Sequence, residues 1–209
     1  MTDELIINKR KIGSKHDPFF IAEAGLNHNG DIKIAKQMID KAIESGADAI
    51  KFQTYKSEEF LTESSEYFSF FKNVELSFNE FKELNDYAKE KKFTFFSAPF
   101  DIPSADFLNK INVPCFKIAS SDLTNMPLIR HIAKMKKPMI ISTGMANQEE
   151  ILEATETSQR NVNKALSRLG TVKKELTDAK QEFDILKEAW ANDVVFDSQY
   201  IECSLSNIS

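Results

Sequence analysis

The alternation of apolar runs with amphipathic stretches over residues 1–150 is the feature that most constrains the fold. The runs are dense in Phe, Ile and Val, do not alternate cleanly with polar residues, and lie at 19–25, 47–55, 93–101, 114–122 and 138–146. This composition is typical of parallel strands that are covered on both faces. The stretches between them predict helices over 32–43, over 77–91 and after Pro127. The order indicates an α/β fold of about five βα units, with a small hairpin in LIINKRKIG ahead of them.

A different pattern begins after about Glu153. Apolar residues recur in alternating steps of four and three, at Ala165, Leu169, Val172, Leu176, Ala179, Phe183, Leu186 and Trp190. Charged residues lie between them, so the pattern is a heptad repeat that predicts a long helix over 160–190. The rest of the tail supplies one short strand or is irregular. A barrel that stops after five strands leaves the edge of its fifth strand open, so we expect the helix to pack on its own barrel or on another copy, as a homo-oligomer.

Residues 56–76 interrupt the strand and helix rhythm and contain four phenylalanines. They follow the second predicted strand, and loops at the carboxyl ends of barrel strands commonly carry active sites. The segment is therefore either an active-site loop or a plain surface loop held down by its aromatic side chains.

Glu23, Lys51 and Lys117 lie near the carboxyl ends of three predicted strands. A buried charge costs several kcal/mol unless it is paired or opens on a polar pocket. Because side chains alternate along a strand, Lys51 and Lys117 should share the face opposite their large apolar neighbours. Two strand spacings put the lysines about 10 Å apart, which suits a molecule with a phosphate and a carboxylate. Glu23 is then a candidate acid or base, and the alternative is a purely structural ion pair.

The loop GLNHNGD follows the first predicted strand. Gly25 and Gly30 permit tight turns and close approach of a ligand to the backbone. Asn27 and His28 offer neutral donors and acceptors, either for a ligand or for the turn itself. Asp31 is placed to cap the next helix, and its role is expected to end there.

The formal net charge of -5 disfavours binding to nucleic acid or to an anionic membrane. The charged first residues and the lack of an apolar run approaching about 18 residues favour a cytoplasmic protein over a secreted or membrane protein. Cys115 and Cys203 are accordingly expected to be reduced thiols.

Five motifs, in the order EAGLNHNGD, ADAIKFQT, FFSAPFD, FKIASSDLTN and IISTGMAN, carry a family resemblance. Residues 5–154 resemble the N-acetylneuraminate (sialic acid) synthase family, which includes the legionaminic and pseudaminic acid synthases. The resemblance implies a (β/α) TIM-type barrel. At 209 residues the chain is short for a complete one, which needs about 250. We therefore expect an incomplete barrel over 1–154 and an unrelated helical tail over 155–209.

The resemblance also implies a reaction, the condensation of phosphoenolpyruvate with an N-acylated amino sugar such as N-acetylmannosamine. The products are a sialic acid and phosphate, and a divalent metal, Mn²⁺ or Mg²⁺, serves as Lewis acid. Carried over residue by residue, the resemblance makes Glu23, Lys117 and Asp122 catalytic. It assigns substrate binding to Asn27, Lys51, Gln53, Phe100 and Ser120.

The sequence departs from the family pattern in three places. Ala98 stands where the family usually has Thr or Ser, and Asp122 stands where it generally has Glu. The family's two metal-binding histidine motifs do not occur in 155–209, and His16, His28 and His131 do not match them. No metal ligand is therefore assigned.

Three interpretations remain open from the sequence. The chain is a sialic acid synthase-type enzyme, or a catalytically incompetent half-barrel that assembles through its heptad helix. The third is a truncated or frameshifted gene product.

Overall fold

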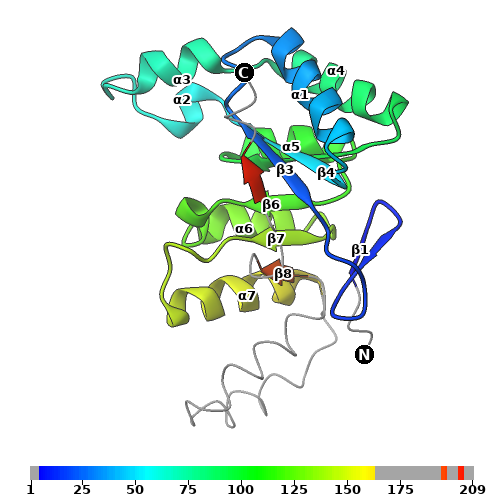
Figure 1. The fold of residues 1–209 in the computed structure, drawn as a ribbon. Helices are drawn as coiled ribbons and strands as arrows, with labels where there is room; N and C mark the ends of the chain where they lie inside the picture. The colour runs from blue at the N-terminus through cyan, green and yellow to red at the C-terminus, as the bar shows by residue number, and fades with distance from the viewer. Residues whose placement is uncertain (1–4, 163–193, 197–201, 205–209) are drawn as a thin grey trace, which may run out of the picture.

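A computed structural model describes residues 5–162, 194–196 and 202–204. Seven strands form one parallel sheet in the order β8-β7-β6-β5-β4-β3-β9 (Figure 1). These strands are β3 (Ile21–Gly25), β4 (Ala49–Thr54), β5 (Thr94–Pro99), β6 (Phe116–Ile118), β7 (Met139–Ile141), β8 (Val194–Phe196) and β9 (Glu202–Ser204). The predicted α/β fold with a parallel sheet is confirmed, and each of the five apolar runs contains one of the strands β3 to β7.

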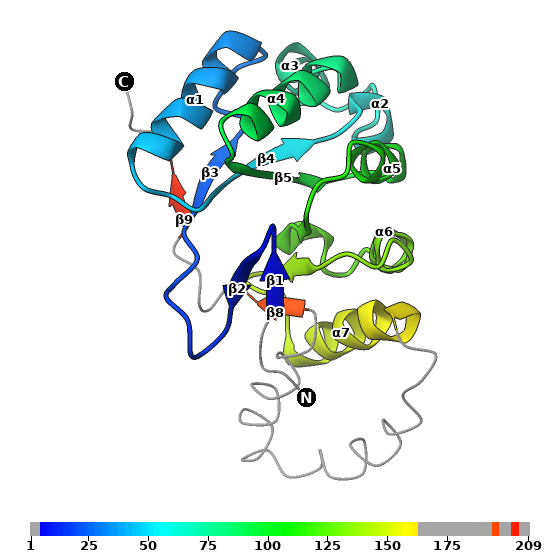
Figure 2. The same cartoon turned by 90° about the vertical axis from the view of Figure 1, so that its right-hand side faces the viewer.

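The helices form a layer on the outer side of the curved sheet (Figure 2). They are α1 (Ile32–Glu44), α2 (Ser57–Phe60), α3 (Phe68–Val74), α4 (Phe78–Glu90), α5 (Ile102–Lys110), α6 (Met126–Ala133) and α7 (Gln148–Val162). Of these, α1, α4 and α6 were predicted from their apolar periodicity. The nine-residue α5 was not predicted, because it is too short for its periodicity to stand out.

Helix boundaries follow local capping chemistry. Asp31 accepts a hydrogen bond from the Lys33 N–H at the start of α1, as predicted. Gly46, just beyond α1, has a φ of 80°, which glycine adopts without the steric cost of a side chain. Ser77 and Glu80 form a reciprocal capping box at the start of α4.

The core lies between the helices and the outer face of the sheet. Phe52 of β4 packs edge to face against Phe81 of α4, with ring centroids 6.5 Å apart, and also contacts Phe95 of β5. All three side chains are buried. The register pairs Phe52 with Ser97 and Ser97 with Phe116, so these positions share the helix-facing side of the sheet.

The predicted N-terminal hairpin is present, with β1 (Leu5–Ile7) antiparallel to β2 (Arg10–Ile12). Its turn residues, Asn8 and Lys9, both have positive φ, as a two-residue hairpin turn with the sheet's right-handed twist requires. Asn8 Nδ2 donates to Thr94 Oγ1 at 3.0 Å, at the first residue of β5. The hairpin therefore contacts the amino end of β5.

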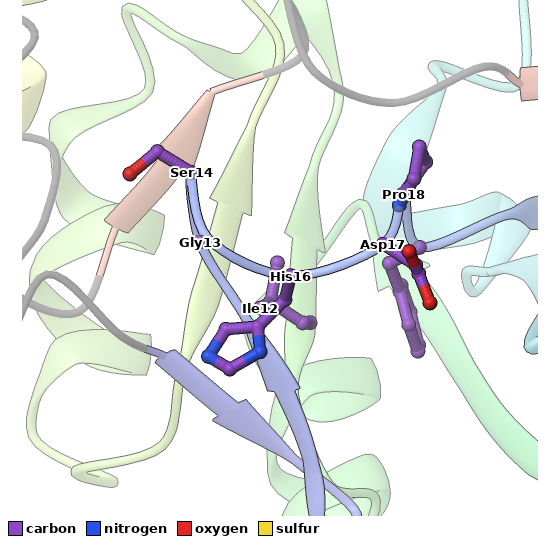
Figure 3. Close-up of a pocket in the computed structure, with 7 residues that line it drawn as sticks. Ile12, Gly13, Ser14, His16, Asp17 and Pro18 are labelled. Carbon is purple, nitrogen blue, oxygen red and sulfur yellow. The ribbon is translucent and has the colours of Figure 1, made fainter.

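The connection from the hairpin to β3 folds around a pocket of about 250 Å³ (Figure 3). Its lining comes from Ile12, Gly13, Ser14, His16, Asp17, Pro18 and Phe19. No residue that the sequence assigned to a site lines this pocket, so it is separate from the candidate site below.

The tail differs from its prediction. It contributes two short strands instead of one, with β8 beside β7 and β9 beside β3. The edge of β7, the strand of the fifth apolar run, is thus paired and not open as expected, because a later segment of the chain returns to it. The hydrophobic periodicity of the sequence does not reveal that the tail pairs with an earlier strand.

The predicted boundary at 154/155 falls inside α7, and the division into two domains stays a prediction. Most of the predicted heptad helix over 160–190 lies outside the described residues. None of the helices in the described part of the chain combines the length and apolar character needed to span a membrane.

Candidate functional site

Two buried lysines lie on the face of the sheet opposite the helices. Lys51 is 5% exposed and Lys117 is 3% exposed. Since Phe52 and Phe116 share the helix-facing side, their neighbours Lys51 and Lys117 point to the other side. The predicted common face is therefore confirmed, and it also carries Gln53, two residues after Lys51.

Glu23 forms an ion pair with Lys51 across the neighbouring strands β3 and β4. The register pairs the two residues directly, and the Glu23 side chain is 19% exposed while that of Lys51 is 6% exposed. Gly25, with a φ of 52°, follows a register shift in β3, and a side chain added there would meet Glu23 Oε1 at 3.4 Å. The turn after β3 is thus shaped around the Glu23 carboxylate.

Lys117 donates a hydrogen bond to the hydroxyl of Ser142, which directly follows β7. Ser142 is buried and was not assigned to the site from the sequence. No local signal singled it out, because Ser142 lies inside the fifth apolar run, 138–146, much as Ser120 lies inside the fourth, 114–122. Two lysines and two flanking polar groups thus line the inner face of the sheet, an arrangement able to hold an anion.

The inner face of β5 carries no hydroxyl at position 98, where the family usually has Thr or Ser and this chain has Ala98. Ala98 pairs in register with Gln53 and is buried. The adjacent Ser97 does not replace the missing group, because its hydroxyl faces the helices and bonds Thr54 Oγ1 at 2.7 Å. Any anion between the lysines therefore lacks a donor from this strand.

Ser120 and Asp122 lie in the 3-10 helix η1 (Ser120–Asp122), directly after β6. Both are half-buried. Burial raises the pKa of Asp122, while hydrogen bonds from Asn125 and Ser121 act in the opposite direction. A carboxyl group with a raised pKa close to Lys117 in the chain is suited to proton transfer, and the assigned role stays a prediction.

The loop after β3 contains two candidate ligand contacts, Asn27 and His28, which differ in their exposure. Asn27 is exposed, whereas His28 is 1% exposed, with its ring centroid 6.0 Å from that of Phe52. His28 Nδ1 accepts from the Gly30 N–H at 3.1 Å. Burial lowers the pKa of His28 to about 4. His28 is therefore a neutral packing residue of the turn, and only Asn27 remains accessible to a ligand.

Phe100 belongs to an aromatic cluster with the insertion after β4. Its ring centroid lies 5.1 Å from that of Phe60 and 6.5 Å from that of Tyr55. Phe71 contacts both Phe60 and Tyr55, and the Tyr55 hydroxyl donates to the Phe71 carbonyl at 2.8 Å. The insertion thus folds into α2 and α3 around Tyr55 and Phe100, which follow the carboxyl ends of β4 and β5.

Glu75 anchors the far end of this insertion. Its carboxylate accepts from Lys56 Nζ at 2.8 Å and from both the N–H and the hydroxyl of Ser57, at 2.9 and 2.7 Å. Burial alone would raise the pKa of Glu75, but these hydrogen bonds outweigh it and lower the pKa to about 2. The insertion is therefore tied at both ends and holds Phe100 in a fixed place.

The described residues do not supply a metal site. Within 5–162, 194–196 and 202–204, no three His, Cys, Asp or Glu side chains gather in a way that could hold a metal ion. His131, for example, bonds Asp106 at 2.6 Å between α5 and α6. The metal that the resemblance implies stays a prediction without assigned ligands.

The NeuB family model matches residues 38–174. The chain belongs to the NeuB family. The predicted resemblance is therefore confirmed.

Several NeuB-type relatives support this membership. An uncharacterized protein of Methanocaldococcus jannaschii is 49% identical over 159 residues, which cover 76% of this chain and 47% of that protein. The N,N'-diacetyllegionaminic acid synthase of Campylobacter jejuni is 39% identical over 155 residues, covering 68% of this chain and 46% of that enzyme. The crystal structure of the N-acetylneuraminic acid synthetase from Leptospira borgpetersenii is similar with a TM-score of 0.74 and 30% identity, and the match covers 97% of this chain and 79% of that one.

The chain spans about half the length of the curated NeuB relatives it matches, 47% and 46% of the two above.

Proposed function

We propose that this chain forms the phosphoenolpyruvate-binding part of a sialic acid synthase-type enzyme, in which β3 to β7 are the first five strands of a (β/α) barrel. The observation that carries the proposal is the pair Lys51 and Lys117, buried on one face of the sheet within β4 and β6. Membership in the NeuB family supports the choice of ligand. The second substrate is an N-acylated amino sugar.

The two lysines bind the anionic groups of phosphoenolpyruvate. Lysine acts as a point charge for phosphate, and a buried site strengthens the attraction because little water screens it. Ser142 holds the Lys117 ammonium group, and Glu23 holds that of Lys51. The substrate therefore meets cations that are already oriented.

The condensation joins C3 of phosphoenolpyruvate to the aldehyde carbon of the sugar. Positive charge develops at C2, water adds there, and phosphate leaves. Glu23 is placed to stabilise the developing charge or to move a proton, because its carboxylate lies on the same face as both lysines. Gln53 and Phe100 contact the amino sugar, and the insertion holds Phe100 in place.

Calorimetric titration of the full chain with phosphoenolpyruvate tests the proposal. We expect binding at the lysine pair, with affinity for this site reduced at least tenfold, about 1.4 kcal/mol, in Lys51→Gln and in Lys117→Gln. The control is Lys33→Gln, an exposed lysine of α1. Unchanged affinity in both site variants would overturn the proposal. Product formation with N-acetylmannosamine and Mn²⁺ is a second measurement, which asks whether this chain alone completes the reaction.

A further inference from the structure

A second cluster of lysines lies at the opposite end of the sheet from the candidate site. It lines a pocket of about 300 Å³ at the amino ends of β5, β6 and β7. The walls include Phe93 just before β5, Phe95 of β5, and Val113 and Pro114 just before β6. The polar lining consists of Asn8, Asn85, Lys89, Asn112 and Lys137.

The turn after α5 brings the two ammonium groups together. Lys89 Nζ donates to the Ile111 carbonyl at 3.2 Å. Lys137 Nζ donates to Asn112 Oδ1 and to the Val113 carbonyl, both at 2.9 Å. Asn85 Nδ2 also donates to the Ile111 carbonyl, at 3.0 Å. Helix α4 and the loop before β7 thus both aim donors at one short turn.

No carboxylate balances these cations. The pocket lining contains no Asp or Glu, and neither lysine forms an ion pair with a described residue. Burial lowers the pKa of Lys137, the Cys115 thiol acts in the opposite direction, and the nearby Lys89 charge lowers it further. Lys89 is exposed and Lys137 half-buried, so water screens part of the repulsion between them, and a bound anion offsets the rest.

Hydrogen bonding of Lys89 and Lys137 to the carbonyl groups after α5 explains only part of this arrangement. Cations do stabilise the carbonyl groups at a helix carboxyl end. These hydrogen bonds, however, occupy one donor of Lys89 and two of Lys137, and each ammonium group has three. A cap also needs no pocket, whereas here the lysines border a cavity with room for a small ligand.

We propose that this pocket binds the phosphate group of a small phosphate-bearing molecule, at a site separate from Lys51 and Lys117. Lys89 and Lys137 supply the charge, and the amides of Asn85 and Asn112 border the ligand. The ligand links the turn after α5 to α4 and to the loop before β7, so its binding tightens the amino end of the sheet.

The test titrates the full chain with inorganic phosphate and, separately, with phosphoenolpyruvate, in a Lys51→Gln background that weakens the other site. The double variant Lys89→Gln/Lys137→Gln keeps hydrogen-bond donors for the carbonyls but removes both charges. We expect it to lose binding at least tenfold, while Lys110→Gln, an exposed residue at the end of α5, has no effect. Binding of phosphoenolpyruvate without phosphate identifies an organic phosphate as the ligand, and binding of both indicates that the phosphate group suffices.

Acetylation of the wild-type chain followed by mass spectrometry keeps the proposal testable if the double variant does not fold. Phosphate should protect Lys89 and Lys137 from acetylation and leave Lys110 unprotected. Equal acetylation with and without either ligand, or unchanged binding by a folded double variant, would overturn the proposal and leave the lysines as caps of α5.

Discussion

Lys51 is held by Glu23, its direct partner on the neighbouring strand, on the face of the sheet that looks away from the helices. The pair is mostly buried, so each charge depends on the other. Glu23 also competes with a ligand for Lys51, because an anion that binds Lys51 lies beside the negatively charged Glu23 carboxylate.

Glu23→Gln should therefore have two opposite effects. The free energy of unfolding should fall by about 1–3 kcal/mol, because the Lys51 charge loses its partner. The affinity for phosphoenolpyruvate should rise by up to about tenfold, because the competing carboxylate is gone. Denaturant melts and calorimetry measure the two quantities. Weaker ligand binding in this variant would instead mean that the orientation of Lys51 by Glu23 matters more for the ligand than the repulsion from its carboxylate.

Ser142→Ala should weaken both the fold and the site. Lys117 loses the hydroxyl that accepts its hydrogen bond, and a buried donor without that partner costs about 1–3 kcal/mol. We expect a lower melting temperature and reduced phosphoenolpyruvate affinity in the same variant. Ser64→Ala, an exposed site in the insertion, is the control. A variant with normal affinity would show that Ser142 only supports the fold.

His28 should make stability depend on pH. Burial lowers its folded-state pKa to about 4 from an ordinary 6.5, so the unfolded chain binds a proton in that window and the folded chain does not. Stability is then complete above about pH 6.5 and falls as the pH drops toward 4, by an amount on the order of 3 kcal/mol. His28→Asn keeps an acceptor for Gly30 and should flatten this slope in melts at several pH values. A slope that persists unchanged in His28→Asn would contradict the assignment.

Lys92→Gly should stabilise the protein. Lys92 follows α4 with a φ of 56°, a conformation that costs a residue with a side chain about 1 kcal/mol and glycine little. Thermal unfolding should occur a few degrees higher in the variant. Glu90→Gly, two residues earlier and within the helix, should lower stability by about 0.5–1 kcal/mol. If both variants were destabilised, the positive φ at Lys92 would carry no strain.

The candidate site was only partly predictable from its residues. Side chains alternate along a strand, so Lys51 was expected opposite Phe52, and Lys117 opposite Phe116. That alternation was enough to put both lysines on one face. His28 stood beside Asn27 in the same motif, but burial against Phe52 removes it from the accessible surface. Ser142 went unassigned because nothing local distinguishes a serine after one strand from a serine after another.

The sequence by itself determined the parallel strands, the hairpin and the family, because apolar periodicity, capping residues and ordered motifs are local features of the chain. Only the tertiary structure decided which strands became neighbours. It paired β8 with β7 and β9 with β3, and it brought Ser142 to Lys117 and Lys89 toward Lys137. These contacts join residues far apart in the chain, and they depend on how strands and helices pack in space, which no local pattern encodes.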